Sequence, residues 1–258
     1  MLSRVPLLPS ADVALGARAP RIASGLATLP LGLCIIGARN TGLLSAARLL
    51  TDLLAPDYCA ACDAPVERER LFCDRCGACP PCPTAPPMIG GLRCSAGGAY
   101  APPLSTAIQR FKFSQRADLA RPLALLLPWP PLELSASVAG GAWSVVPVPL
   151  HYARLVERGF NPSALLARQL CQRIGAQCAP ELLQRRRITA QQSRLPARQR
   201  RANVAGAFHA PSALKGRKIV LIDDVVTTGS TLLACCQALY AAGVDRVTVL
   251  ALAAAPAP

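Results

Sequence analysis

The segment 218–231, KIVLIDDVVTTGST, restricts the possible folds of this chain more than any other feature. Its apolar run, 219–222, is typical of a buried strand in a parallel sheet and ends in two adjacent carboxylates, Asp223 and Asp224. A turn rich in hydroxyl groups follows, after which the pattern changes to that of a helix. The segment therefore predicts a strand, a loop and a helix within an α/β fold.

The turn after the carboxylates is suited to a phosphate group. Backbone N–H groups and the positive end of a helix attract anions, Gly229 permits close approach, and neighbouring hydroxyls donate hydrogen bonds. Ionised carboxylates accept hydrogen bonds and therefore suit vicinal hydroxyls. A ribose 5-phosphate unit carries both kinds of group. The predicted phosphate-binding residues are Thr227, Thr228, Gly229, Ser230 and Thr231.

The C-terminal part of the chain predicts a right-handed βαβ unit. A strand at 218–222, a helix at 231–242 with Gly243 as its C-cap, and a strand at 246–252 follow one another. Another short strand, 145–148, ends at Pro149. We expect a doubly wound parallel sheet, in which ligands bind beyond the carboxyl ends of the strands.

Twelve cysteines form the second strong pattern, and seven of them lie between positions 59 and 94. A Cys-x-x-Cys pair places two thiolates on one tight turn, and two such pairs complete a tetrahedral zinc site. Disulfides are the alternative, although the rest of the chain favours a reducing, cytoplasmic compartment. The predicted ligands of a structural Zn²⁺ are Cys59, Cys62, Cys73 and Cys76. Cys79, Cys82 and Cys94 would supply three ligands of a second site whose fourth ligand is missing.

The chain is strongly basic, with a net charge of +14 and 25 arginines against three lysines. Between positions 154 and 201 there are eleven arginines and only two acidic residues. Such a run indicates a phosphate-bearing partner, either a small phosphorylated ligand or nucleic acid; a solvated basic face is the alternative. Because aromatic residues make up only 4%, sequence-specific reading of nucleic-acid bases receives little support.

The N-terminal residues 1–45 show no sustained periodicity, and we expect a disordered or misannotated leader. The uncharged stretch 22–38 contains Pro30 and is shorter than the roughly 20 apolar residues that a membrane span needs. We therefore expect no membrane span; a cleaved export signal is the alternative. Residues 46–97 are interpreted as a helix plus a cysteine zinc-ribbon module, and 98–258 as the α/β domain.

Taken together, the motifs resemble the ComF family, in which a zinc ribbon precedes a phosphoribosyltransferase-like domain. Segment 218–231 resembles the 5-phosphoribosyl-1-pyrophosphate signature of type I phosphoribosyltransferases. The chain differs from the family in two respects. Pro162 stands where the family commonly has Gln, and the family's second pair of Cys-x-x-Cys turns (zinc knuckles) is truncated here to Cys79, Cys82 and Cys94. The resemblance covers about residues 48–253. Its other matching positions are 100–104, Ile108, 111–113 (FKF), 145–150 (VVPVPL), Arg154, 158–161 (RGFN), Thr189, Gln192, Leu195, Arg198, Asn203 and Phe208.

The resemblance implies a type I phosphoribosyltransferase fold that binds 5-phosphoribosyl-1-pyrophosphate with Mg²⁺ and transfers the phosphoribosyl group to a nucleophile. Asp223 and Asp224 would hold the ribose hydroxyls, and residues 227–231 would hold the 5-phosphate. The loop that begins at Pro149 and Leu150 and reaches Arg154 would receive pyrophosphate. Arg154 or Arg158 would neutralise this leaving group. The family's association with DNA uptake and use implies the same role here.

Two alternatives without catalysis remain open at this point. The chain could be a binding module that contacts single-stranded DNA or a DNA-uptake motor, or it could be a sensor of phosphoribosyl pyrophosphate. The polar segment 189–203 fits either a flexible flap over the site or a surface for such a partner. Asn161 and Pro162 predict the N-cap and first residue of a helix, with Arg158 in the loop before it.

Overall fold

The structure is a computed structural model, and it describes residues 57–67, 70–81, 88–89, 92–128, 143–187, 197–211 and 214–255. The expected leader, 1–45, and the expected helix before the cysteines lie outside the described residues. Within the described ranges, no helix has the length and apolar character needed to cross a membrane.

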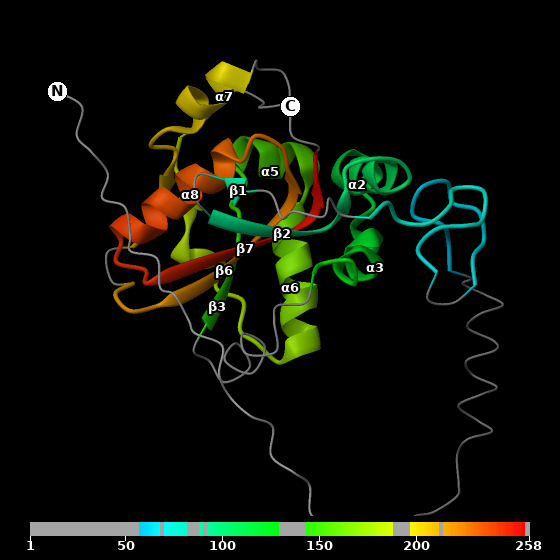
Figure 1. Cartoon of the computed structure of the whole chain (residues 1–258), viewed down its shortest axis with the longest axis horizontal. Coiled ribbons are helices and arrows are strands. Elements are labelled where there is room, and N and C mark those ends of the chain that lie inside the picture. The colour runs from blue at the N-terminus through cyan, green and yellow to red at the C-terminus, as the bar shows by residue number, and fades with distance from the viewer. Residues whose placement is uncertain are drawn as a thin grey trace, which may run out of the picture. The chain divides into compact units, whose positions relative to one another are not determined.

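A five-stranded sheet with the order β1-β2-β7-β6-β3 forms the centre of the fold (Figure 1). Strands β2, β7, β6 and β3 run parallel to one another, and β1 pairs antiparallel with β2 at one edge. A separate antiparallel pair consists of β4 and β5. The strands are β1 (Met88–Ile89), β2 (Leu92–Ala99), β3 (Trp143–Pro147), β4 (Gln184–Arg185), β5 (Phe208–His209), β6 (Lys218–Val226) and β7 (Arg246–Ala254).

Helices cover both faces of this sheet, as Figure 1 shows. On one face, α6 packs on β3 and β6 with α3 beside it, while α8 belongs to the opposite face with β5 and α7. The described helices are α2 (Leu104–Phe113), α3 (Ala120–Ala124), α5 (Tyr152–Arg158), α6 (Pro162–Ile174), α7 (Ala197–Val204) and α8 (Ser230–Ala241), with single 3₁₀ turns at Ala117–Leu119 and Pro180–Leu182.

The alternation of side chains along β6 explains why helices cover both faces of the sheet. Val220 and Ile222 lie in one core with residues of α2, α3 and α6, whereas Ile219 and Leu221 lie in the other core with residues of α8. Successive side chains of a strand point to opposite faces, so a strand that is apolar at every position is buried on both sides. This arrangement confirms the predicted doubly wound parallel sheet.

Strand β6 is longer than predicted. The expected strand ended at Ile222, but pairing with β7 continues through Asp223↔Ala251 to Val226↔Ala254. The two carboxylates therefore belong to the strand itself, near its carboxyl end. Asp224 is only 8% exposed, which places it at the boundary of the core.

The segment between β3 and α6 contains a short helix where a loop was expected. His151 Nδ1 accepts a hydrogen bond from the N–H of Ala153 and caps α5, so Arg154 lies on a helix. Arg158 is the last residue of α5, and Gly159, with a φ of 80°, ends it. The prediction for α6 was correct, since Asn161 is its N-cap and Pro162 its first residue.

Strand β2 begins within the segment 46–97 that the sequence interpretation assigned to the cysteine module. It pairs with β7 from Cys94↔Val249 onwards and is therefore part of the central sheet. The cysteine module packs against α2, because Cys59, Ala60 and Phe72 share a core cluster with Phe111.

Candidate functional site

A cavity of about 580 Å³ opens at the carboxyl ends of β3 and β6. This volume lies within the range of about 300–1,000 Å³ that is usual for small-molecule sites. Five further helices and strands supply lining residues: α2, the end of α5, the start of α6, β4 and the start of α8. Among the predicted site residues, those that line it are Pro149, Leu150, Arg158, Asp223, Asp224, Thr227 and Thr231.

The carboxylate pair has separate partners for its two members. Asp223 Oδ1 accepts hydrogen bonds from Ser163 Oγ at 3.1 Å and from the N–H of Asp224 at 2.9 Å. Asp224 Oδ1 lies 2.8 Å from Lys112 Nζ, and both side chains of this ion pair are largely buried. Burial, together with the neighbouring charge of Asp224, raises the pKa of Asp223 to about 7. Such a shift is frequent in functional sites.

Three cationic side chains surround these acids. Lys112 comes from α2, Arg158 from the end of α5 and Arg185 from β4. The Arg158 guanidinium lies 4.9 Å from the centre of the Phe113 ring, and burial lowers the pKa of Arg158 while the charge of Asp224 opposes this. With three cations to two carboxylates, the cavity favours a ligand that carries several negative charges.

The hydroxyl-rich turn connects β6 to α8 at the edge of the cavity. Gly229 is the N-cap of α8 and has a φ of 69°, a conformation that glycine adopts without the strain of a side chain. Thr228 Oγ1 and Ser230 Oγ lie 3.0 Å apart in this turn. A hollow of about 30 Å³ is lined by the turn residues 227–231. The predicted phosphate-binding residues thus surround one small space at a helix N-terminus.

Arg154 lies apart from the other predicted site residues. Its guanidinium Nη1 is 2.6 Å from Glu157 Oε2 on the exposed side of α5, and it is not among the described residues that line the cavity. The helix places Arg158, one turn further on, at the cavity instead. Of the two arginines expected near the leaving group, the structure therefore brings only Arg158 to the acid pair.

Sequence reasoning gave no site role to several residues that line the cavity. The motif FKF at 111–113 was recognised only as part of the family resemblance, yet its Lys112 pairs with the second carboxylate. Ser163 lies two residues after the predicted N-cap, Asn161, and that position was the available signal for its role. The residues without a predicted site role are Tyr100, Gln109, Lys112, Phe113, Val148, Asn161, Pro162, Ser163, Arg185 and Val225.

Several arginines of the basic run make contacts within the fold, among them Arg185 and Arg187. Arg185 lines the cavity, and its guanidinium lies 5.4 Å from the centre of the Phe208 ring. Arg187 Nη2 donates to the carbonyl oxygens of Asn203 and Ala205, each at 2.8 Å, and so holds the end of α7. Residues 189–196 of the expected flap, 189–203, lie outside the described residues.

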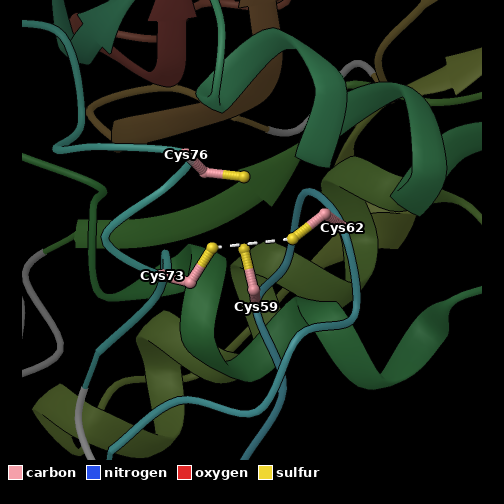
Figure 2. Close-up of side chains that lie close together, drawn as sticks. All are labelled: Cys59, Cys62, Cys73 and Cys76. Carbon is pink, nitrogen blue, oxygen red and sulfur yellow. Dashed lines mark hydrogen bonds between the residues drawn. The ribbon is translucent and has the colours of Figure 1, made fainter.

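Four cysteine side chains converge in the module that precedes the sheet, as Figure 2 shows. Their Sγ atoms all lie within 4.8 Å of one another, and those of Cys62 and Cys73 are 3.6 Å apart. Tetrahedral Zn²⁺ with bonds of about 2.3 Å would separate its sulfur ligands by about 3.8 Å. The geometry therefore fits a zinc ion held by the predicted residues, Cys59, Cys62, Cys73 and Cys76.

The backbone of the module supports this arrangement. Each knuckle is followed by a residue with positive φ, Asp63 at 61° and Gly77 at 81°, which turns the chain back towards the sulfur atoms. Although burial acts in the opposite direction, hydrogen bonds from the N–H of Cys73 and from other backbone N–H groups lower the pKa of Cys59 to about 6. A thiolate is the form that binds metal.

The described residues do not assemble the second cysteine set. Cys94 is fully buried on β2, in the core cluster on the α8 side of the sheet, whereas Cys79 packs against the cluster on the other side. Burial also raises the pKa of Cys79. Cys82 lies outside the described part of the chain. Among the described residues, the group at 59–76 alone has the geometry of a metal site.

Comparisons with known proteins agree with this architecture. The model of the phosphoribosyl transferase domain family matches residues 130–258. Over 203 residues the chain is 36% identical to the DNA utilization protein YhgH of Escherichia coli (strain K12), which covers 75% of this chain and 88% of that protein. Competence protein F of Haemophilus influenzae is 31% identical over 207 residues, covering 77% of this chain and 85% of that protein.

A shorter match is to a phosphoribosyltransferase. The hypoxanthine/guanine phosphoribosyltransferase of Methanococcus maripaludis is 34% identical over 73 residues, which is 28% of this chain and 40% of that protein. The longer matches extend beyond the domain model towards the cysteine module. The chain therefore belongs to the phosphoribosyl transferase domain family and, within it, to the ComF-type proteins, in which a cysteine cluster precedes that domain.

Proposed function

We propose that this chain binds 5-phosphoribosyl-1-pyrophosphate together with Mg²⁺ in the 580 Å³ cavity. The observation that carries the proposal is that the acid pair, the hydroxyl-rich turn and three cationic side chains all border the same space. The ligand has a matching set of groups: vicinal ribose hydroxyls, a 5-phosphate and a pyrophosphate. Carboxylates accept from hydroxyls, and cations and helix N-termini attract phosphates.

The proposed roles of the residues follow from their positions. Asp223 and Asp224 hold the ribose hydroxyls, and residues 227–231 hold the 5-phosphate. Arg158 and the chain at Pro149 and Leu150, which line the same cavity, receive pyrophosphate. Carboxylate and phosphate oxygens are the ligands that Mg²⁺ prefers, so the acid pair and the ligand would hold the ion. Bound there, Mg²⁺ would neutralise negative charge on the pyrophosphate.

The reaction proposed for this site is phosphoribosyl transfer. The bond between ribose C1 and the pyrophosphate oxygen breaks, and a nucleophilic acceptor forms a bond to C1. Because the ribose gains positive charge during this exchange, the protein contributes mainly positioning and electrostatic stabilisation. Tyr100, Gln109 and Phe113 also line the cavity, and we assign the acceptor to their side.

The names of the relatives support a role in the uptake or use of DNA. A second candidate function is direct contact with single-stranded DNA. The observation that favours it is α7, an eight-residue helix with the sequence ARQRRANV that carries three arginines and no acid. Phosphate contacts by such a helix would be strongly salt-dependent and largely independent of base sequence.

Isothermal titration calorimetry tests the main proposal. The full chain should bind 5-phosphoribosyl-1-pyrophosphate in the presence of Mg²⁺, and it should bind ribose 5-phosphate or pyrophosphate alone more weakly, because each part uses only some of the contacts. Absence of binding to the whole ligand in the presence of Mg²⁺ would contradict the proposal. Release of pyrophosphate during incubation with candidate acceptors would distinguish a transferase from a sensor.

A further inference from the structure

Helix α2 connects the cysteine module with the acid pair. Arg110 and Lys112 are two residues apart on this helix and therefore point to different sides of it. The guanidinium of Arg110 forms an ion pair with Asp63, the residue that follows the cysteine ligand Cys62. The ammonium of Lys112 lies 2.8 Å from Asp224 Oδ1. One turn of α2 thus contacts both the cysteine module and the acid pair.

The contact with the cysteine module has several components. Arg116 Nη1 lies 2.6 Å from the other carboxylate oxygen of Asp63, and Arg110 Nη1 also donates to the carbonyl oxygen of Ala60 at 3.4 Å. Phe111, between Arg110 and Lys112, is fully buried in the core cluster that contains Cys59 and Ala60. Its ring centre is 5.5 Å from that of Phe160. These contacts oppose rotation of α2 about its axis.

We propose that Asp63, through Arg110 and Arg116, makes Lys112 a positioning residue that holds the Asp224 carboxylate in the phosphoribosyl site. The part that concerns ligand affinity rests on the function proposed above. Lys112 places its ammonium 2.8 Å from Asp224 Oδ1, and the orientation of α2 fixes where its aliphatic chain starts. Loss of the Asp63 contacts frees the helix end and lets the ammonium leave the carboxylate.

The substitution Asp63→Asn removes the charge of this contact with little change of shape. Asn tolerates the positive φ of 61° at this position, so the zinc knuckle keeps its backbone conformation. Asp74→Asn is the matched control. Asp74 follows the cysteine ligand Cys73, its side chain is 87% exposed, and its ion pair is with Arg70 within the module. The zinc content of both variants should equal that of the wild type.

The first readout needs no ligand. The chain has only three lysines, Lys112, Lys215 and Lys218, so competitive acetylation followed by mass spectrometry reports the accessibility of Lys112 directly. Lys112 is paired and its side chain is 19% exposed in the wild type, whereas Lys215 is exposed and serves as the internal reference. Because Asp63→Asn weakens two partly exposed ion pairs, acetylation of Lys112 relative to Lys215 should rise about threefold. Asp74→Asn should leave this ratio unchanged.

The second readout is a double-mutant cycle on the affinity for 5-phosphoribosyl-1-pyrophosphate with Mg²⁺. Lys112→Met should weaken binding roughly tenfold or more, since a charged hydrogen bond is lost in a partly buried site. Lys112→Arg should retain most of the affinity. Asp63→Asn should weaken binding in the wild-type background and have no further effect in the Lys112→Met background, because both act on the same contact.

Each outcome decides the proposal. Unchanged acetylation of Lys112 in Asp63→Asn, or an equal rise in Asp74→Asn, would overturn it, since the contact would then not act specifically. Equal loss of affinity from Asp63→Asn in both backgrounds would show that Asp63 does not act through Lys112. If the wild type fails to bind the ligand, the proposed function fails, and the acetylation ratio still decides whether Asp63 positions Lys112.

Discussion

The hydroxyl of Ser163 donates a hydrogen bond to Asp223 Oδ1 at 3.1 Å, which joins the first turn of α6 to the acid pair on β6. The same turn is also fixed to the residue that follows β3, because Asn161 Nδ2 donates to the carbonyl oxygen of Val148 at 3.0 Å. Pro162 lies between these two contacts and has a fixed φ suited to the first position of a helix. The start of α6 is therefore a rigid wall of the cavity.

Substitution of both carboxylates should abolish Mg²⁺-dependent binding of 5-phosphoribosyl-1-pyrophosphate. Asp223→Asn keeps an oxygen that accepts from Ser163, so its fold should be retained. Asp224→Asn leaves the Lys112 ammonium without its charged partner and should cost about 1–3 kcal/mol of unfolding free energy. Titration calorimetry and denaturant unfolding measure the two effects.

The exposed Asp245 directly precedes β7 at the amino ends of the parallel strands, away from the cavity at their carboxyl ends, and provides the control for charge. Asp245→Asn should bind the ligand like the wild type. Wild-type affinity in the double variant Asp223→Asn, Asp224→Asn would refute the assignment of the acid pair.

The contribution of Asp223 to the free energy of unfolding should fall as the pH rises from about 4 to about 7. The pKa of Asp223 is about 7 in the folded protein and about 3.9 in the unfolded chain, so across this window the unfolded chain has released a proton that the folded protein retains. Ionisation then costs stability, and this cost is fully present above pH 7. Asp223→Asn should remove this contribution. Denaturant unfolding of the wild type and of Asp223→Asn across this pH window measures the contribution. Parallel pH profiles of the two proteins would contradict the prediction.

Arg158 and Arg154 should differ in their effect on ligand binding. Arg158 lines the cavity beside Phe113, whereas Arg154 pairs with Glu157 on the exposed side of α5. Arg158→Gln should weaken binding of the pyrophosphate-bearing ligand roughly tenfold or more, and Arg154→Gln should change it little. Calorimetry with ribose 5-phosphate adds a second comparison, because Arg158→Gln should affect that ligand less. Equal losses for the two variants would contradict the placement of pyrophosphate.

Purified protein should contain about one zinc ion per chain, held by the four converging cysteines. Cys59→Ser should release the metal, and because a site of this size folds on its metal, residues 57–95 should lose hydrogen-exchange protection first. Cys59 shares a core cluster with Phe111, so the loss should extend to α2. Cys79→Ala should keep its zinc. Metal analysis that finds no zinc in protein prepared without chelator would refute the site.

The arginines of α7 provide the test of nucleic-acid contact. Replacing Arg198, Arg200 and Arg201 with Gln should flatten the log–log dependence of single-strand affinity on salt by roughly 2, at about 0.7 per lost phosphate contact. Three exposed arginines elsewhere, Arg121, Arg168 and Arg217, give a control with the same change of net charge. If the basic segment instead covers the phosphoribosyl site, the α7 variant should weaken ligand binding and leave the salt slope unchanged.

The fold class and both local motifs could be predicted from the sequence because their physical causes are local. The apolar run 219–222, the turn at Gly229 and the cap at Asn161 depend on neighbours along the chain. The zinc knuckles likewise depend on two short spacings. These are the parts of the molecule in which residue type and sequence distance decide the conformation.

The partners of the acid pair were decided by the tertiary structure. Lys112 reaches Asp224 from a helix that precedes the strand by more than a hundred positions, and Ser163 reaches Asp223 from 60 positions away. The extension of β6 beyond Ile222 depends on its pairing with β7. No periodicity in the sequence signals such contacts, because they arise only when separate elements pack on the same sheet.

The same limit applies to the arginines. Composition showed a basic run between positions 154 and 201. It could not predict which of these arginines reach the cavity, since every arginine carries the same charge. Helix α5 directs Arg158 to the cavity and Arg154 to Glu157, and β4 places Arg185 beside Phe208. The sequence by itself determined the chemistry available to this protein, whereas packing of the helices around the sheet decided which charges meet, because direction in space depends on the whole fold.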